Sequence, residues 1–393
     1  MKTNNNIPAY RFQGYTDAWE LRKLGELGTL KNGMNFSKDA MGIGFPFINL
    51  QNIFGKNIVD VSQLGLAKAS SIQLKNYNLQ KGDVLFVRSS VKLEGVGEAA
   101  IVPKNLENTT YSGFIIRYRD SFGLDYNFKR FTFGTSNIRN QIMSQATDSA
   151  NKNISQQVLA ELDILVPSLP EQSAIGTFFS TLDRHITLHQ RKLDTLKEQK
   201  KTYLKLLFPA KGQTKPALRF QGFEDDWKEV KLGELCDIRT GKLDANAMVE
   251  NGEYDFYTSG IKKYRIDVAE FEGPAITIAG NGATVGYMHL ADGKFNAYQR
   301  TYVLTNFKVD RSYIFSEIAK KLPIKIQQEA RTGNIPYIVL SMLTELSISL
   351  PTLPEQEVIG TFFSTLDQEI AQVEDKLASL KEMKKTLLRK LFV

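Results

Sequence analysis

The chain has 393 residues, of which 42% are hydrophobic and 24% charged, as is typical of a soluble globular protein of two or three domains. No apolar run reaches the ~18–20 residues that span a bilayer, and residues 1–6 lack the apolar core of a signal peptide. We therefore expect a cytoplasmic protein with no membrane association. The net charge of +7 permits a nucleic-acid partner, and the single cysteine, Cys236, excludes an internal disulfide and a cysteine-cluster metal site.

The first half of the chain begins with markers that recur later. Residues 8–14 (Pro-Ala-Tyr-Arg-Phe-Gln-Gly) and residues 23–27 (Lys-Leu-Gly-Glu-Leu) return at an offset of 208, and the two tryptophans, Trp19 and Trp227, obey the same offset. These repeats predict two equivalent halves. In the first half we predict strands over residues 82–87, 114–118 and 162–167 and a helix over residues 126–147. Glycine- and asparagine-rich turns separate these elements.

A long helix follows the first mixed segment. From Glu171 to Phe208, apolar residues recur at alternating steps of three and four, which is the heptad seam of a coiled coil. His189 and Lys200 occupy the two remaining seam positions. Pro170 suits the first helical turn, where a missing N–H costs nothing. Pro209 ends the helix before a short linker.

The second half repeats this pattern. Residues 275–279, 302–304 and 346–351 predict strands, and residues 312–330 predict a helix. Residues 354–367 repeat residues 170–183 almost letter for letter at an offset of 184, and Lys384 takes the seam position of Lys200. The middle of the first half is therefore 24 residues longer. We interpret this as a duplicated scaffold with diverged recognition segments; two structural domains with drifting loops are the alternative.

The sequence contains no convincing catalytic set. The GxxxxGK[ST] nucleotide loop is absent, and three histidines, His185, His189 and His289, do not form a metal-binding pattern. Residues 334–337 (Asn-Ile-Pro-Tyr) are similar to the Asn-Pro-Pro-Tyr motif with which amino-methyltransferases hold a target base. Ile335 replaces the first proline, and no glycine-rich cofactor turn accompanies the segment, so we interpret residues 331–334 as a polar loop and expect no enzyme.

Together these features resemble the specificity subunit of type I restriction–modification systems over nearly the whole chain. The motifs that carry the resemblance are Leu-Pro-Glu-Gln at 169–172 and 353–356, tryptophan with Lys-Leu-Gly-Glu at 23–26 and 231–234, and residues 45–48, 81–86, 257–260 and 276–282. The resemblance implies an α/β (α+β) protein in which an antiparallel two-helix coiled coil separates two mixed target-recognition domains, with a pseudo-twofold repeat. The implied segments are 1–167 for the first domain, 168–208 for the first helix, 209–215 for a linker, 216–351 for the second domain and 352–393 for the second helix.

The same resemblance implies the function. Each domain would read one half of a split, asymmetric target in double-stranded DNA, and the coil would hold the spacing and dock two methyltransferase subunits. Two translocase–nuclease subunits would complete a restriction complex. S-adenosylmethionine, ATP and magnesium would belong to those partners, so we expect no cofactor and no metal in this chain. A self-contained methyltransferase and a coiled-coil scaffold without DNA reading remain alternatives.

Candidate contact residues follow from the chemistry of DNA. Phosphates need cationic or polar donors, and bases need side chains that present donor–acceptor pairs. Each candidate could instead be a solvated loop residue. The candidates for DNA contact are Arg88, Ser89, Ser90, Lys92, Ser136, Asn137, Arg139, Ser259, Lys262, Lys263, Asn281, Gln299, Arg300 and Arg331.

The repeat itself favours an antiparallel coil, because Lys200 and Lys384 would lie at the same level in a parallel pair and repel each other. Phe178 and Phe179 should then lie near Leu387 and Leu391. The candidates for the coil and its partner interface are Phe178, Phe179, Leu182, Ile186, Leu193, Leu196, Phe362, Phe363, Leu366, Ile370, Leu377 and Leu380.

Overall fold

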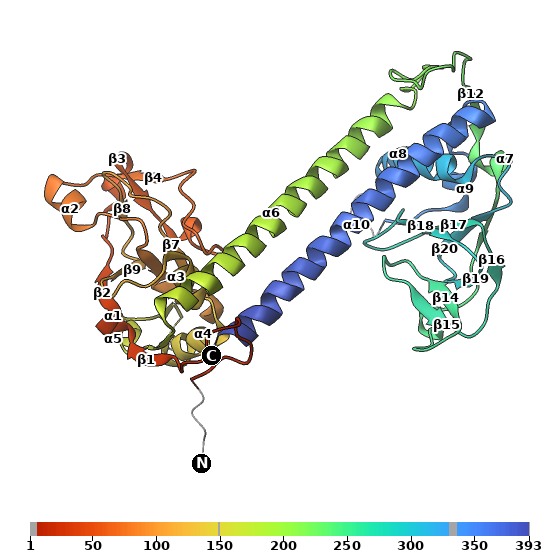
Figure 1. Cartoon of the computed structure of the whole chain (residues 1–393). Helices are drawn as coiled ribbons and strands as arrows, with labels where there is room; N and C mark the ends of the chain where they lie inside the picture. Colours follow the sequence, from red (N-terminus) through yellow and green to blue (C-terminus); the bar gives the residue numbers. More distant parts are fainter. Residues whose placement is uncertain (1–5, 148–149, 330–335, 393) are drawn as a thin grey trace. The chain divides into compact units, whose positions relative to one another are not determined.

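The computed structural model describes residues 6–147, 150–329 and 336–392 (Figure 1). It forms two compact units. Unit 1 comprises residues 1–189 and 376–393, and unit 2 comprises residues 190–375. Two long helices, α6 (Leu169–Leu206) and α10 (Leu353–Leu391), each contribute one part to each unit.

Unit 1 is built on an antiparallel four-stranded sheet with the strand order β2-β9-β5-β7. A three-stranded sheet, β4-β3-β8, and two two-stranded ladders, β1-β11 and β10-β6, complete its strands. The strands are β1 (Glu20–Lys23), β2 (Gly28–Asn32), β3 (Met41–Ile48), β4 (Gly65–Ala67), β5 (Val84–Val87), β6 (Ser89–Ser90), β7 (Ala99–Ile101), β8 (Thr110–Tyr111), β9 (Ile115–Asp120), β10 (Lys152–Asn153) and β11 (Asp163–Val166). The helices are α1 (Leu24–Leu27), α2 (Ser71–Asn76), α3 (Tyr126–Thr132), α4 (Ser136–Gln145) and α5 (Gln156–Ala160), with 3-10 turns at η1 (Lys38–Ala40), η2 (Leu50–Asn52) and η3 (Leu93–Gly95).

Unit 2 repeats this plan. Its central antiparallel sheet has the order β13-β20-β17-β18, its second sheet has the order β15-β14-β19-β16, and β12 pairs with β21. The strands are β12 (Lys228–Lys231), β13 (Asp237–Thr240), β14 (Tyr254–Tyr257), β15 (Tyr264–Ile266), β16 (Phe271–Glu272), β17 (Ala275–Ala279), β18 (Met288–Ala291), β19 (Lys294–Ala297), β20 (Thr301–Thr305) and β21 (Ser347–Leu350). The helices are α7 (Leu232–Leu235), α8 (Arg311–Glu329) and α9 (Leu340–Thr344), with a 3-10 turn at η4 (Ala245–Ala247).

The strand registers show that the duplication extends through the middle segments, where the sequences differ. Strand β5 corresponds to β17. Each lies next to an edge strand, β7 or β18, and each pairs on its other side with an inner strand, β9 or β20, over four residues. In the same way β9 corresponds to β20, and the parallel pair β3-β8 corresponds to the parallel pair β14-β19. Structure therefore supplies the position-by-position alignment that the sequence could not.

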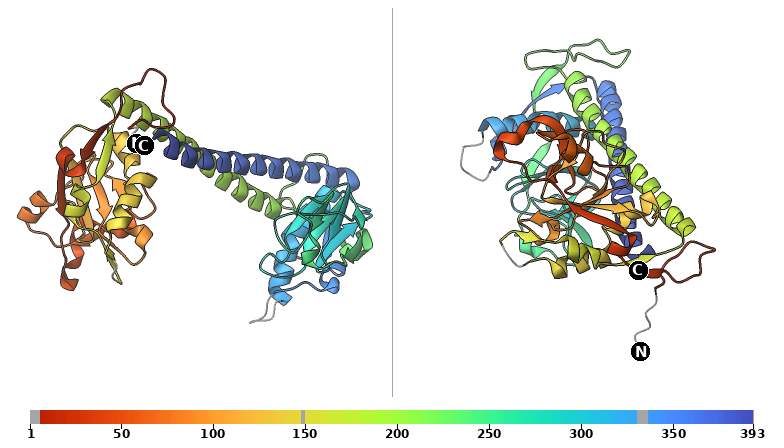
Figure 2. Two further views of the ribbon diagram at one scale, coloured as in Figure 1. Left: turned by 90° about the horizontal axis from the view of Figure 1, so that it is seen from below. Right: turned by 90° about the vertical axis from the view of Figure 1, so that its left-hand side faces the viewer.

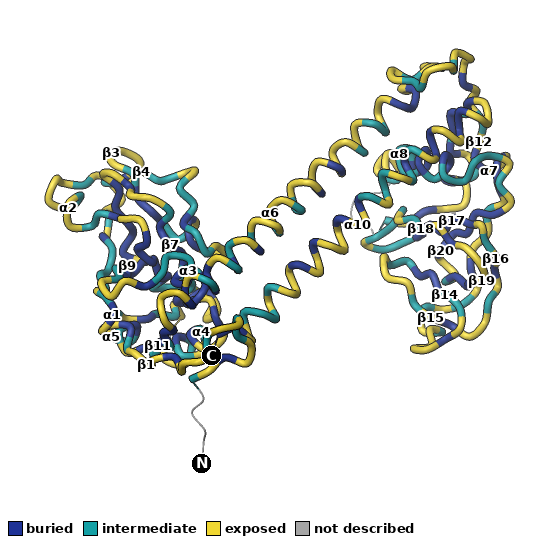
Figure 3. Tube along the Cα trace, viewed as in Figure 1, coloured by how far each residue is buried: buried dark blue, intermediate teal, exposed yellow. Residues whose placement is uncertain are grey.

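Apolar residues of the central sheets form the cores. In unit 1, β5 is buried along its whole length, and both of its faces are covered, by one cluster that includes Phe86 and Tyr118 and another that includes Leu85 and Tyr111. In unit 2, β17 and β20 are likewise buried throughout. In Figure 3 dark, buried trace runs through the interior of each unit, and in unit 2 it includes the region labelled β17 and β20. Runs of apolar residues without alternation are expected for strands that are covered on both faces.

Most predicted elements agree with the observed ones within two residues, and the mixed α/β class is confirmed. The prediction of one helix over residues 126–147 was wrong, because α3 ends at Thr132 and α4 begins at Ser136. Thr135 has an extended backbone, with φ −69° and ψ 152°, and Gly134 precedes it. A glycine and an extended residue cannot continue a helix, so the chain turns between the two.

The long helices pair in antiparallel orientation within each unit, as predicted. In unit 1 the first turns of α6 lie beside the last turns of α10, which the two views of Figure 2 also show. Phe179 shares a buried cluster with Leu391 and Phe392, and Leu387 packs against it. In unit 2 the ring of Tyr203, near the end of α6, lies 5.1 Å from the ring of Phe362, near the start of α10. In the part of the chain that the structure describes, no helix is long and apolar enough to cross a bilayer.

Candidate nucleic-acid interface and its scaffold

Three loops of unit 2 meet at one end of its central sheet. One follows β14, one joins β17 to β18, and one precedes β20. The backbone N–H of Tyr298 donates to the carbonyl of Tyr257 over 2.9 Å, and that of Gly280 donates to the carbonyl of Arg300 over 2.9 Å. The Ser259 hydroxyl donates to the Asn281 side-chain oxygen over 2.6 Å. Four predicted residues, Ser259, Asn281, Gln299 and Arg300, are thus brought together.

The lysines of the first loop differ in their surroundings. Lys262 is exposed, and its Nζ lies 5.4 Å from the centre of the Tyr264 ring. Lys263 Nζ lies 3.6 Å from a carboxylate oxygen of Asp255, which partly neutralises its charge. A phosphate would therefore meet a less compensated cation at Lys262 than at Lys263.

His289 packs against the residues that flank these loops. His289 Nε2 lies 3.4 Å from the carbonyl oxygen of Gly260, and the imidazole ring packs on Tyr257 and Tyr287 at 5.2 and 4.9 Å between ring centres. Burial lowers the pKa of His289. The residue is therefore a neutral packing element at neutral pH and helps to fix the loop that carries Lys262 and Lys263.

One candidate residue was missed by sequence reasoning. Tyr337 forms an isolated bridge with Asn281 and is 55% exposed, so it belongs to the same loop cluster. It is the last residue of the Asn-Ile-Pro-Tyr segment, whose Asn334 and Ile335 lie outside the described residues, as does Arg331. The segment is a weak match to a catalytic motif, and its Tyr337 places an aromatic ring beside the predicted DNA contact Asn281.

The corresponding loops of unit 1 hold most of the first domain's candidates. The Arg88 N–H donates to the carbonyl of Phe114 over 2.8 Å, and the Ile154 N–H donates to the carbonyl of Arg88 over 3.0 Å. Ser89 and Ser90 form β6. A groove of about 630 Å³ opens beside them, and it is lined by Leu50, Phe54, Ser89, Ser90, Val91, Lys92, Glu94, Gly95, Glu98, Phe114 and Asn151.

The other three candidates of unit 1 lie on α4. Ser136 and Asn137 are exposed on its first turn, and neither is among the residues that line the groove. The Arg139 guanidinium donates to the carbonyls of Val96 and Glu94 over 2.7 and 2.6 Å, and burial lowers its pKa. Arg139 thus holds in place the turn that follows Lys92.

The repeated Pro-Glu-Gln motif anchors each helix to its domain. Glu171 is 1% exposed and forms a bidentate ion pair with Arg11, at 2.7 Å for both bonds. Glu355 is fully buried and forms the same pair with Arg219, again at 2.7 Å. Both arginines come from the repeated Arg-Phe-Gln-Gly segment, so the two repeats form one structural device.

The glutamine of the motif connects three segments. The Gln172 side-chain oxygen accepts from the Asp125 N–H over 2.9 Å, while its amide donates to the carbonyl of Pro167 over 2.9 Å. Gln356 makes the same two bonds, with Asp310 at 3.1 Å and Pro351 at 2.9 Å. We therefore interpret the motif as an element that joins each long helix to its domain, and not as a DNA contact.

A glycine of each repeat permits a close helix contact. A Cβ atom placed on Gly176 would lie 2.7 Å from the Phe128 nitrogen, and one placed on Gly360 would lie 2.8 Å from the Tyr313 nitrogen. Real Cβ atoms do not approach backbone so closely. The repeated glycine therefore lets α3 and α8 start directly against α6 and α10, respectively.

Each anchor also receives the end of the other long helix. In unit 1, Phe392 lies beside Trp19, Phe128 and Phe179, with ring centres 5.6–6.3 Å apart. In unit 2, Phe208 takes the equivalent place beside Trp227, Tyr313 and Phe363, at 5.5–6.1 Å. The aromatic clusters explain why the only tryptophans of the chain belong to the repeat.

The repeated aspartates and the seam lysines pair with each other. Lys384 Nζ lies 2.6 Å from Asp183, and Lys200 Nζ lies 2.5 Å from Asp367. The two pairs are equivalent by the offset of 184, and only an antiparallel pair of helices can form both. The sequence predicted only that Lys200 and Lys384 are kept apart in an antiparallel coil. Their ion pairs with Asp367 and Asp183 also define the register of the two helices.

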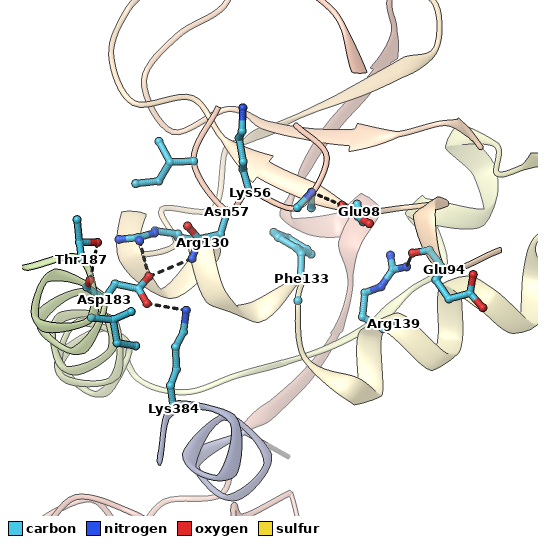
Figure 4. A pocket seen from close by; sticks show the side chains of 15 residues that line it. Lys56, Asn57, Glu94, Glu98, Arg130, Phe133, Arg139, Asp183, Thr187 and Lys384 are labelled. Atoms are coloured by element: carbon cyan, nitrogen blue, oxygen red, sulfur yellow. Dashed lines mark hydrogen bonds and ion pairs between the residues drawn. The ribbon is translucent and has the colours of Figure 1, made fainter. Parts of the chain in front are cut away.

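The two aspartates differ in their further partners. In unit 1, Asp183 also accepts from Arg130 over 2.5 Å and from Asn57 over 3.2 Å (Figure 4). Asp183 is 17% exposed and Asp367 is 36% exposed. Among the described residues, Lys200 is the one cation within ion-pair distance of Asp367. Domain 1 is thus tied to both long helices by a polar network that unit 2 lacks in its described part.

The predicted seam residues occupy the pairing side of the helices. Leu182 and Leu380 share one buried cluster, and Ile186 and Phe178 pack against it. Phe363 lies in the buried cluster of unit 2, and Phe362 packs against it. Leu193, Leu196, Ile370 and Leu377 are buried, and Leu366 is half-buried. Whether any of these positions also contacts a partner subunit stays a prediction.

Comparison with known proteins identifies the group to which this architecture belongs. The family described as "Type I restriction modification DNA specificity domain" matches residues 16–198 and 224–382, which together cover most of the chain. The chain therefore belongs to this family. Its two matched regions coincide with the two structural repeats.

Individual relatives agree. The EcoDI specificity subunit of Escherichia coli is 38% identical over 164 residues, which cover 42% of this chain and 36% of that protein. The MjaX specificity subunit of Methanocaldococcus jannaschii, itself described as putative, is 23% identical over 404 residues, which cover 94% of this chain and 92% of that protein. The crystal structure of a type I restriction–modification S subunit from M. genitalium has a TM-score of 0.71 at 20% identity and covers 98% of this chain and 99% of that one. At this identity the match establishes the fold.

Proposed function

We propose that the chain is the non-catalytic DNA-specificity subunit of a type I restriction–modification complex. The observation that carries this proposal is the contrast between equivalent anchors and different loops. Both units use the same Arg–Glu pair, glycine contact and aromatic cluster, while the loop ends of their central sheets present different side chains. Two fixed frames with two different surfaces suit a target of two unlike half-sites.

The DNA partner is supported by the chemistry of the loops. Exposed Lys92, Lys262 and Arg300 are suited to phosphates or base edges, and amide and hydroxyl groups at Asn281 and Ser90 are suited to base edges. Among the described residues, no group of three or more acidic, histidine or cysteine side chains could hold a metal ion. We assign S-adenosylmethionine, ATP and magnesium to partner subunits.

The partners in this proposal are two methyltransferase subunits, which dock on the helix pair, and two translocase–nuclease subunits. A solved structure that resembles this chain in fold, at a TM-score of 0.53 and 18% identity, concerns complex assembly and conformational transition of the type I restriction–modification system. We place the complex in the cytoplasm. Segments 1–167 and 216–351 serve as recognition domains, and 168–208 and 352–393 serve as the scaffold.

The test is an exchange of one recognition segment. Residues 34–160 would be replaced by the matching segment of a relative, and the chain would be co-expressed with its methyltransferase subunits. Mapping methylated bases should show that one half of the target changes and the other half stays. A change in both halves, or in neither, would contradict modular reading.

Two controls separate the alternatives. Methyl transfer by the purified chain alone would support a self-contained methyltransferase, and an assembled complex that does not discriminate sequences would support a pure scaffold. Replacing Lys262 by alanine should weaken binding to all sequences and reduce the salt slope by about one. Replacing Lys263, which faces Asp255, should reduce it less.

A further inference from the structure

The hydrogen-bond register defines one pair of neighbouring positions at the loop end of each central sheet. In unit 1, the Arg88 N–H donates to the carbonyl of Phe114, directly beyond the pair Val87–Ile115. In unit 2, the Gly280 N–H donates to the carbonyl of Arg300, directly beyond the pair Ala279–Thr301. Arg88 is therefore equivalent to Gly280, and Phe114 is equivalent to Arg300.

A third segment of each unit confirms this equivalence. The Ile154 N–H donates to the carbonyl of Arg88, and the Ile338 N–H donates to the carbonyl of Gly280. Ile154 and Ile338 are related by the offset of 184 that also relates the two long helices. Each unit thus has one arginine at this place, but on opposite strands of the pair, and the second strand of unit 1 carries a phenylalanine instead.

The surroundings of Phe114 are apolar. Phe114 is 57% exposed and Val91 is 77% exposed, and both line the groove of about 630 Å³ together with Leu50 and Phe54. Leu50 packs at the edge of one core of unit 1, whereas Phe114, Val91 and Phe54 belong to neither of its two core clusters, so their exposed apolar surface is not explained by these cores.

The charges in the groove argue against a phosphate as the occupant. Of the residues that line it, Glu94 and Glu98 are acidic and Lys92 is basic, so the lining itself carries more negative than positive charge. Glu98 already accepts from the Gly55 N–H over 2.7 Å. A base edge carries no net charge, and the major-groove edge of thymine presents a methyl group that makes apolar contacts.

We propose that this position reads a base in each half-site, with different chemistry. Phe114, supported by Val91 and Phe54, contacts the 5-methyl group of a thymine in the first half-site, and Arg300 contacts a guanine in the second. This inference rests on the proposed function, since it names the base edges that the two domains select.

Base analogues test the inference on the assembled methyltransferase complex. After the target has been mapped, deoxyuridine, which lacks only the 5-methyl group, would replace each thymine of the first half-site in turn. At one position the wild-type complex should bind about 4-fold more weakly, as expected for the loss of one buried methyl group. With Phe114→Ala the same replacement should have no effect.

The second half-site provides the matching experiment. Replacement of guanine by 7-deazaguanine removes the N7 acceptor, and at one position it should weaken wild-type binding about 10-fold, within the range for bidentate arginine contacts. With Arg300→Ala that loss should disappear, and with Phe114→Ala it should remain.

Phe122→Ala serves as the control, because Phe122 is 50% exposed in unit 1 but does not line the groove. It should keep the full response to deoxyuridine. A first half-site without any A·T pair, an absent response at every thymine, or a response that survives in Phe114→Ala would overturn the inference. If the complex bound DNA without sequence preference, the proposed function would fail instead.

Discussion

Unit 1 and unit 2 hold their long helices with the same bonds, yet their loop ends offer different surfaces. The Arg–Glu distances are equal at 2.7 Å, and the central rings of the two aromatic clusters correspond: Trp19 to Trp227, Phe128 to Tyr313, Phe179 to Phe363 and Phe392 to Phe208. At the loop ends, by contrast, the residues at equivalent positions differ: Arg88 of unit 1 corresponds to Gly280 of unit 2, and Phe114 corresponds to Arg300. The Arg–Glu and aromatic contacts that hold each domain on the long helices are the same in the two units, whereas the loop residues that we propose to face DNA differ.

The contacts between the domain and the long helices are nevertheless not identical in the two units. Asp183 has Arg130, Lys384 and Asn57 as partners, and Asp367 has Lys200. Arg130 comes from α3, and its equivalent in unit 2 is Phe315, a residue of α8. The extra bonds join domain 1 to α6 and α10 at a point beyond the common anchor.

The largest expected effect concerns the shared anchor. Glu171→Gln and Glu355→Gln should each lower the free energy of unfolding of their own unit by about 3–5 kcal/mol, because each leaves a partly buried arginine without its carboxylate. In a Trp227→Phe background, Trp19 is the one tryptophan and reports on unit 1. In a Trp19→Phe background, Trp227 is the one tryptophan and reports on unit 2. Urea unfolding of the four combinations measures the two units separately.

The control for this experiment is Glu20→Gln. Glu20 pairs with Arg22 over 2.8 Å at the surface, where both side chains are more than 40% exposed, so its loss should cost at most about 1 kcal/mol. Unequal costs for Glu171→Gln and Glu355→Gln, by more than a factor of two, would break the equivalence of the anchors.

The next effect should separate the units. Asp183→Asn should destabilise unit 1 by about 1–3 kcal/mol, since hydrogen bonds to charged partners are lost in a partly buried site. Asp367→Asn should cost unit 2 about 0–1 kcal/mol, because the pair with Lys200 is more exposed. The same tryptophan reporters measure both. In the assembled complex, Asp183→Asn should also widen the range of accepted gaps between half-sites more than Asp367→Asn does.

A double-mutant cycle identifies the source of the difference. If Arg130 provides it, Arg130→Gln should add little to Asp183→Asn, because the two residues share one interaction. Equal costs for the two aspartate variants would show that the additional partners of Asp183 contribute nothing.

The sequence predicted the parts of the fold that depend on local pattern. The helix starts at Pro170 and Pro354 were found within two residues, because a proline in the first turn and an uninterrupted heptad are local signals. The equivalence of Phe114 with Arg300 could not be predicted, since the offset between the units changes from strand to strand and the segments share no sequence. The partners of Lys200 and Lys384 were also missed, because they depend on the register of two helices far apart in the chain.

A smaller expected effect comes from His289, whose equivalent in unit 1 is Ala100, as the strand registers show. Burial lowers the pKa of His289, and nearby Lys263 lowers it further, while Asp255 and the Gly260 carbonyl oppose the shift. The unfolded chain therefore takes up a proton at a higher pH than the folded one. The contribution to stability is complete above the unfolded pKa of about 6.5 and is lost as pH falls through the lower folded value.

Unit 2 should consequently lose stability between pH 7.5 and 5.5, and His289→Gln should remove that part of the dependence. Unfolding midpoints followed through Trp227 measure it, and Trp19 reports on unit 1, where Ala100 cannot titrate. A midpoint of unit 2 that does not respond to pH in this interval would remove His289 from the differences between the units.

The smallest expected effect would make the two ends of the coil more alike. In unit 2, Lys192 Nζ lies 2.7 Å from Glu369. The offset of 184 relates these residues to Lys376 and His185, both in unit 1, so a pair of helices that obeys the same symmetry should place those two side chains within reach of each other. His185→Glu should then stabilise unit 1 by about 0.3–0.5 kcal/mol, the usual value of an exposed ion pair, and the gain should vanish in 1 M salt, where the screening length falls to about 3 Å. His185→Gln controls for the loss of the imidazole. If His185→Glu gave no more stability than His185→Gln at low salt, the pseudo-twofold relation would hold for the buried contacts of the coil but not for its surface.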